Sequence, residues 1–296
     1  MNILVNGEAI VLEHGPNGTL GEALSGADDL LEKAGRVIVS LKVDGHIVDA
    51  ENYGSFAERP SSDFGQIDIA AEPAATIRIR SLETLQELLK LTVQAARDDE
   101  PSDWHVLRKG AADIRDAFSG LFAADELSFV QLFADLLART GDEPDTSERI
   151  EIAAQAERLE LIFAERLAEL TDPVAEMRAA AAVFETQAPE LAELPVLLQT
   201  GKDERAMKAV TYFIEVFNKV IRLMPELDRS GVPTQDVRID GQNLSAFYAA
   251  FNGVLRQLTE AFEHKDAVLI GDLAEYEVLP RMRSFFAALK EVMPLS

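Results

Sequence analysis

The chain has 296 residues, a formal net charge of −24 at pH 7 and no cysteine. At about 150 residues per domain the length predicts two domains, and a hydrophobic content of 47% suffices to form their cores. The lack of cysteine excludes disulfides, a catalytic cysteine and cysteine-ligated zinc. The excess of 52 acidic over 28 basic residues disfavours nucleic acid and anionic membranes, which bind through clustered lysine and arginine.

The start of the chain has neither the basic nor the apolar segment of a signal peptide. No apolar run approaches the length of about 18 residues that a transmembrane helix needs. The lack of cysteine also suits a reducing compartment. We therefore expect a cytoplasmic protein with no transmembrane helix.

Residues 1–80 combine short β-type runs with glycine turns. Asn6–Gly7 and Asp44–Gly45 each lie between apolar runs, and such pairs favour hairpin turns because both residues tolerate a positive φ. Thr19 and Glu22 form a capping box that opens a helix, which is expected to end near Gly35. Two hairpins are therefore expected on either side of one helix.

Four isoleucines, Ile67, Ile69, Ile77 and Ile79, alternate with other residues and predict closing strands. The resulting order is β-β-α-β-β-β. A small mixed sheet packed on one helix, a β-grasp-like domain over residues 1–80, accommodates this order.

The same region resembles the small sulfur-carrier proteins of the ubiquitin-like class. The similarity lies in residues 3–8, in the loop from Gly15 to Gly18 and in residues 19–24. Those carriers end in a Gly-Gly carboxylate that is activated and thiolated. Here residues 70–73 have the sequence Ala-Ala-Glu-Pro and the chain continues, so the resemblance implies the fold without the chemistry. We expect the module to serve contact or scaffolding.

Residues 81–296 have helical patterns separated by breakers, without a repeat of fixed period. Asp172–Pro173 is typical of a helix start, and Gly201 is typical of a helix end. We expect a second domain, an all-α helical bundle over residues 81–296, and the pattern allows a further boundary near residue 201. The predicted helices cover 82–98, 103–123, 125–140, 146–170, 173–200, 203–229, 242–264 and 267–293.

The last three of these helices have the clearest apolar periodicity, with steps of three and four residues. Such a seam keeps one face of a helix toward a neighbour, and short connections favour antiparallel neighbours in a bundle. Pro280 is expected to kink the last helix. The seam predicted for 203–229 consists of Met207, Val210, Ile214, Phe217, Ile221 and Met224.

No known catalytic or metal-binding motif is present. The four histidines, His14, His46, His105 and His264, fall in different predicted elements, and neither His105 nor His264 has a glutamate three residues before it. Phosphate-loop, dinucleotide-binding and nucleophile-elbow motifs are absent. The sequence therefore predicts no catalytic residue, no metal site and no cofactor.

The densest group of polar residues lies near the start of the last helix. Asp272, Glu275 and Tyr276 occupy neighbouring positions on it, and Glu277 follows. They suit a divalent-cation site or an acid/base pair. The alternative is structural: Asp266 caps the helix, the other carboxylates face water and Tyr276 packs at the seam.

Aromatic residues on the neighbouring helices suggest a binding groove. Phe247, Tyr248, Phe251 and Tyr276 suit a partly open groove for a partner helix; the structural alternative places Tyr248 beside an apolar seam of the bundle. The candidate binding residues are Phe247, Tyr248, Phe251, Asp266, Asp272 and Tyr276.

Two resemblances concern the last part of the chain. Residues 243–248, Leu258 with Ala261, and Lys265–Asp266 resemble the helical bundle of flagellin export chaperones, although Phe262 stands where that family has asparagine. Residues 265–277 are similar to the C-terminal signature of a group of uncharacterised bacterial proteins. The first resemblance implies a chaperone-like role, and the second carries no function.

The sequence thus predicts an α+β protein with a β-grasp-like head and a helical bundle. It favours a non-enzymatic, cytoplasmic adaptor or chaperone-like protein that binds a partner helix or chain of another protein on the C-terminal bundle. Two alternatives stay open: an enzyme or regulator with a carboxylate or divalent-metal site on the last helix, and a structural subunit of a homo-oligomer.

Overall fold

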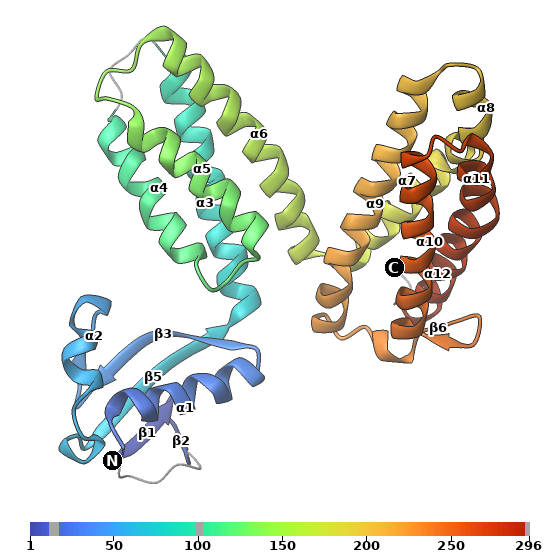
Figure 1. The fold of residues 1–296 in the computed structure, drawn as a ribbon. Coiled ribbons are helices and arrows are strands. Elements are labelled where there is room, and N and C mark those ends of the chain that lie inside the picture. Colours follow the sequence, from blue (N-terminus) through green and yellow to red (C-terminus); the bar gives the residue numbers. More distant parts are fainter. Residues whose placement is uncertain (12–17, 99–102, 294–296) are drawn as a thin grey trace. The chain divides into compact units, whose positions relative to one another are not determined.

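The computed structural model describes residues 1–11, 18–98 and 103–293 (Figure 1). The chain divides into two compact units, Met1–Leu167 and Ala168–Ser296. The predicted class, α+β with an N-terminal mixed sheet followed by helices, is confirmed. The division falls inside one long helix, and the sequence-based boundaries near residues 80 and 201 stay predictions.

The first unit begins with a five-stranded sheet in the order β2-β1-β5-β3-β4. β1 and β5 run parallel, and the other neighbouring pairs are antiparallel. Helix α1 packs on this sheet through its buried leucines, and a short helix, α2, follows β4. The elements are β1 (Asn2–Val5), β2 (Glu8–Ile10), α1 (Leu20–Lys33), β3 (Arg36–Val43), β4 (His46–Ile47), α2 (Ala50–Ala57) and β5 (Gln66–Pro73).

The predicted local signals form this sheet. Both residues of Asn6–Gly7 and of Asp44–Gly45 have positive φ, as the tight hairpin turns require. Thr19 accepts a hydrogen bond from the backbone N–H of Glu22, and the Glu22 carboxylate accepts one from the N–H of Thr19. Gly35 ends α1 with φ +66°. Residues 15–17 of the predicted loop, and His14, lie outside the described residues.

One predicted feature of this region is wrong. Ile77 and Ile79 do not form a strand; they lie in helix α3 (Ala74–Arg97), which begins directly after Pro73. Their alternation is too short to define a strand. The buried residues Arg78, Leu82, Leu85 and Leu89 follow helical spacing, so the helix extends back through both isoleucines.

The rest of the first unit is helical. Its core includes the only tryptophan, Trp104, together with buried phenylalanines. Arg166 donates from Nε to Oε1 of Glu126 at 2.5 Å, and both side chains are about one-tenth exposed. The helices are α3, α4 (Trp104–Phe118), α5 (Ala124–Arg139) and α6 (Thr146–Thr171), the last of which ends in the second unit.

The second unit is a bundle of helices with one small hairpin. Asp172 and Asp266 cap α7 and α11 as predicted, each accepting a backbone N–H three residues on. The segment after α9 forms a small hairpin of β6 (Arg238–Ile239) and β7 (Gln242–Asn243). The helices are α7 (Pro173–Ala192), α8 (Leu194–Gln199), α9 (Asp203–Arg229), α10 (Leu244–Glu263), α11 (Ala267–Asp272) and α12 (Leu279–Val292).

The last predicted helix is divided into three segments. A π-helical segment (Leu273–Val278) joins α11 to α12, and Pro280 lies in the first turn of α12. Proline has no N–H to donate, so it is tolerated in the first turn of a helix, where the backbone N–H groups have no partner in the same helix. The sequence placed the irregularity at Pro280, whereas the structure has a π-helical segment before the proline.

Gly271 occupies a position where α11 packs closely on α8. A Cβ atom added there would lie 2.8 Å from Cβ of Pro195 and closer still to its Cγ. We expect Gly271→Ala to lower the free energy of unfolding by about 1–3 kcal/mol, because the rigid proline ring cannot move aside.

The matched control for this prediction is Gly253→Ala in α10. A Cβ atom at Gly253 would meet nothing within 4 Å, so alanine should stabilise the helix by about 0.5–1 kcal/mol. Urea unfolding of the two variants, followed by circular dichroism, measures both changes. Changes of the same sign would contradict the close packing of Gly271 on Pro195.

Candidate functional site

The predicted aromatic groove is largely filled by the protein's own core. Phe247 and Phe251 are 5% and 0% exposed. The Phe247 ring stacks on Phe251 at 5.7 Å and on Phe285 at 5.8 Å, and Phe217 meets Phe251 edge-on at 5.3 Å. These rings hold α9, α10 and α12 together, so neither Phe247 nor Phe251 presents a surface to a partner.

Tyr248 and Tyr276 lie in different environments. Tyr248 is half-buried, and its hydroxyl is buried without a hydrogen-bond partner among the described residues. Burial raises the pKa of the Tyr248 phenol to about 12. Tyr276 is 65% exposed in the π-helical segment. The two tyrosines therefore do not form one aromatic surface with Phe247 and Phe251.

The acidic candidates have structural or solvent-facing positions. Asp266 accepts the N–H of Leu269 at 3.0 Å as the cap of α11. Asp272 and Glu275 are exposed, and Glu277 forms an ion pair with Arg281. The described residues contain no group of three or more histidine or carboxylate side chains placed to hold a metal ion.

Helix α9 exposes an apolar row that sequence analysis assigned to the core. Its buried face lies one position earlier than the predicted seam. Of the six predicted seam residues, Val210, Phe217 and Met224 are half-buried against the core, whereas Met207, Ile214 and Ile221 are 52%, 49% and 48% exposed. The residues of the buried face are Ala206, Ala209, Phe213, Val216, Val220, Leu223, Glu226 and Leu227.

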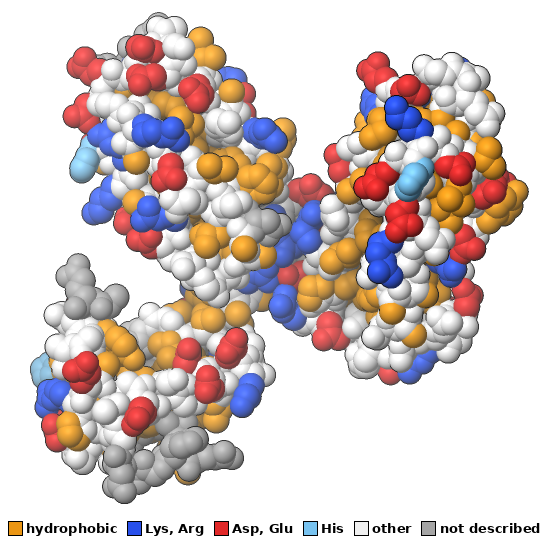
Figure 2. All heavy atoms as spheres, viewed as in Figure 1, with side chains coloured by type: hydrophobic (Ala, Val, Ile, Leu, Met, Phe, Trp, Pro, Cys, Tyr) orange, Lys and Arg blue, Asp and Glu red, His pale blue; other side chains and the backbone are white. Residues whose placement is uncertain are grey.

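We call the exposed row, Met207, Ile214 and Ile221, the α9 stripe. Its members are seven residues apart, which is two helical turns, so the row extends over about 21 Å at about 1.5 Å per residue. Figure 2 shows hydrophobic side chains at the surface in the region of α9, among charged ones. The stripe continues the hydrophobic core outward along one side of the helix.

The charges of α9 are unevenly neutralised. Four of its five basic residues form ion pairs inside the second unit: Arg205 with Glu190, Lys219 with Glu176, Arg222 with Glu169 and Arg229 with Glu226. Lys208 lies over the ring of Tyr212. Two exposed carboxylates of α9, Glu204 and Glu215, make no ion pair with any described residue. The exposed side of the helix is consequently acidic.

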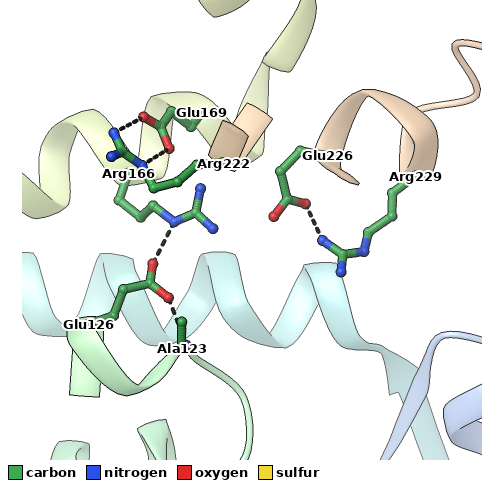
Figure 3. A network of polar contacts seen from close by, with 7 residues as sticks. All are labelled: Ala123, Glu126, Arg166, Glu169, Arg222, Glu226 and Arg229. Carbon is green, nitrogen blue, oxygen red and sulfur yellow. Dashed lines mark hydrogen bonds and ion pairs between the residues drawn. The ribbon is translucent and has the colours of Figure 1, made fainter. Parts of the chain in front are cut away.

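Buried carboxylates anchor two of these ion pairs (Figure 3). Glu169 is fully buried, and Arg222 donates to both of its oxygens, from Nε at 3.2 Å and from Nη2 at 2.7 Å. Glu226 is 5% exposed and accepts from Nη1 of Arg229 at 2.7 Å. Each of these two cations of α9 is thus neutralised by a buried carboxylate of the second unit.

Sequence reasoning named the residues of the stripe but placed them in the core. Two apolar rows run side by side along α9, and each has the three- and four-residue steps of a helical seam. The row of small residues, Ala206 and Ala209, packs closely on α7, and this leaves the larger Met207 and Ile214 outside. The seven-residue spacing of the row was visible in the sequence, but the sequence did not show that the row faces solvent and not the core.

Comparison with known proteins matches two parts of the chain to family models and names no function. Residues 1–72 match the model described as the TP0873 N-terminal domain, which covers all five strands of the sheet except the last residue of β5. Residues 176–287 match a domain of unknown function, DUF8042, which includes the whole of α9. No curated protein and no solved structure matches the chain. None of the helices in the described part has the length and apolar content of a membrane span.

Proposed function

We propose that this protein is a non-enzymatic adaptor or chaperone-like protein that binds an amphipathic helix of another protein along the α9 stripe. The observation that carries the proposal is the half-exposed row of Met207, Ile214 and Ile221 on a helix whose other apolar face is already in the core. We place this activity in the cytoplasm, and we propose that the N-terminal sheet is a ubiquitin-like β-grasp module that supports contact or scaffolding.

The spacing of the stripe favours a helical partner. Apolar residues repeated every seven positions meet the matching row of a second helix at every second turn. An extended chain places alternate side chains on one face, with a repeat of about 7 Å, and does not match the repeat of about 10.5 Å along α9. The resemblance of residues 243–266 to flagellin export chaperones agrees with a helix-binding role.

The negative charge beside the stripe favours a different protein over a second copy of this chain as the partner. The unpaired carboxylates of Glu204 and Glu215 attract a helix with lysine or arginine beside its apolar row. A second copy of α9 would bring the same carboxylates to the interface, where like charges repel. The proposed partner is therefore a basic amphipathic helix of a different protein.

The exposed area predicts a moderate affinity. About half of each stripe side chain would leave water on binding, on the order of 80 Å² and 2 kcal/mol per residue at about 25 cal/mol per Å². The translational and rotational freedom lost on association offsets much of the burial free energy summed over the three residues. We expect a dissociation constant of about 1–100 μM.

Substitution of the stripe tests the proposal in the full-length protein. The probe is a 21-residue peptide of three heptads with leucine at positions a and d and lysine at e and g, titrated by calorimetry at physiological salt. Ile214→Asp should weaken binding about tenfold or more, because it places a charge in the apolar contact. Circular dichroism should show unchanged helicity, since Ile214 is 49% exposed.

Val268→Asp is the matched control, because Val268 is also exposed on a helix of the second unit but lies outside the stripe. It should change the dissociation constant less than twofold. Equal binding by the wild type and Ile214→Asp would refute the proposal. A stable homodimer in light scattering that Ile214→Asp dissociates would assign the stripe to a second copy instead.

A further inference from the structure

The N-terminal sheet leaves part of one edge without a neighbouring strand. β3 pairs with β5 along one side, but on its other side β4 pairs only with Lys42 and Val43. The backbone N–H of Val48 adds one hydrogen bond to the carbonyl of Leu41 at 3.0 Å. No described strand lies beside residues 36–40 on that side. Residues 36–40 can therefore accept a further strand. Together with Leu41, whose carbonyl is hydrogen-bonded to Val48, we call them the β3 edge (residues 36–41).

A bulge changes which side chains of this edge face the helix. Ile38 is opposite Ala71 and Ser40 is opposite Ala70, so Val39 is an extra residue without a partner in β5. Ile38 and Leu41 pack on the core with α1, whereas Val39 is 43% exposed. The bulge therefore leaves an apolar side chain at the rim of the sheet instead of in its core.

An open cavity of about 500 Å³ lies beside the β3 edge. It is bordered by α1, by the β3 edge and by the chain from Val48 to the first turns of α2, which Figure 1 shows near the end of β3. Apolar side chains form part of its lining, with buried Leu24, Leu41 and Val48 among them. The volume suffices for one or two side chains of a bound segment.

The charges around this cavity are acidic. Asp28 of α1 and Asp49, which precedes α2, line it together with the hydroxyl-bearing Ser25 and Tyr53. Neither aspartate has an ion pair or a side-chain hydrogen bond with any described residue. No lysine or arginine lines the cavity, and Arg36, at the start of β3, donates to the carbonyl of Ala71 in β5.

We propose that the β3 edge binds an extended segment of another polypeptide by strand addition, with an apolar side chain in the cavity and lysine or arginine beside Asp28 and Asp49. An extended backbone can pair its N–H and C=O groups with a strand edge in register, and alternate side chains then point to the same face. A second copy would bring its own carboxylates to this edge, so like charges disfavour it. This surface is independent of the α9 stripe.

The test uses the full-length protein and a defined peptide, Ac-Thr-Lys-Thr-Ile-Thr-Lys-Thr-NH₂. In an extended conformation its isoleucine and both lysines lie on one face. NMR of ¹⁵N-labelled protein should show shifts of the backbone amides of residues 36–41 on titration. The same peptide with glutamate in place of lysine should bind at least about tenfold more weakly, because like charges then face each other. A variant N-methylated at alternate residues should not bind, since it cannot donate the strand hydrogen bonds.

Two neighbouring aspartates supply the matched protein variants. Asp28→Lys should weaken binding of the lysine peptide about tenfold, whereas Asp29→Lys makes the same charge change on α1 outside the cavity and should alter it less than twofold. A bulge can also protect an edge from pairing. That role would be shown by no binding at millimolar peptide. The proposal would be overturned by this lack of binding or by binding that causes no shifts in residues 36–41. Equal binding of the N-methylated peptide, or shifts of these amides that appear when the concentration of the protein alone is raised, would also overturn it.

Discussion

Replacing Phe251 by alanine is expected to destabilise the second unit by about 3–5 kcal/mol. The Phe251 ring is fully buried and contacts the rings of Phe217 and Phe247. Its removal leaves a cavity between α9 and α10 that the neighbouring rings can close only in part. Urea unfolding followed by circular dichroism at 222 nm measures the change. Fluorescence of Trp104 follows the first unit separately, because it is the only tryptophan.

Ile214→Ala provides the control for this experiment. Ile214 is half exposed, so its truncation should cost no more than about 0.5–1 kcal/mol. If Phe251 were instead a surface residue of a binding groove, Phe251→Ala would leave stability unchanged and weaken partner binding. A loss below about 1 kcal/mol would therefore contradict the packing of α9, α10 and α12 described above.

Replacing Arg222 by alanine is expected to cost about 3–5 kcal/mol, because it removes two hydrogen bonds from a fully buried carboxylate. Glu169 has no exposed surface, and both of its oxygens accept from Arg222. Loss of these bonds removes part of what compensates the desolvation of the Glu169 carboxylate. Denaturant unfolding of the single variant provides the measurement.

Two further variants separate burial from charge. Arg205→Ala breaks the exposed pair with Glu190 and should leave stability unchanged, since solvent screens that pair. The Arg205 guanidinium lowers the pKa of Glu190, chiefly through their hydrogen bond, but both groups remain in contact with water. Glu169→Leu combined with Arg222→Leu should be more stable than Arg222→Ala, because the buried carboxylate is removed together with the arginine that binds it. Equal losses for Arg205→Ala and Arg222→Ala would show that burial of Glu169 has no energetic role.

Local sequence signals predicted much of the fold. The hairpins at Asn6–Gly7 and Asp44–Gly45 and the caps at Thr19, Asp172 and Asp266 all form as expected. Each depends on a few neighbouring residues with strong conformational preferences. Tertiary packing has little influence on these turns and caps, so they can be predicted from a single sequence.

Signals that depend on packing were less informative. The alternation at Ile77 and Ile79 suits a strand, but the helical row that begins at Arg78 overrides it. On α9 two apolar rows compete for the core, and only the close approach of α7 determines that Met207, Ile214 and Ile221 remain outside. The bulge at Val39 and the cavity beside β3 depend on pairing with β5, which no local pattern of β3 specifies.

The difference between Phe251 and Ile214 also changes how partner binding should be tested. Aspartate at Phe251 would unfold the bundle, and loss of binding would then have no bearing on the interface. Aspartate at Ile214 changes the surface while leaving the core packed. The α9 stripe therefore allows a test of binding that is separate from folding.

The most direct test of the central claim is photo-crosslinking of the full-length protein in its native host. A photoreactive phenylalanine analogue replaces Ile214 in one variant and Val268 in the other, and mass spectrometry identifies the crosslinked products. We predict one dominant partner polypeptide at position 214, joined through an amphipathic segment with basic flanks, and no such product at position 268. Crosslinks at position 214 only to the protein itself, or the same products at both positions, would contradict the assignment of the α9 stripe as a helix-binding surface.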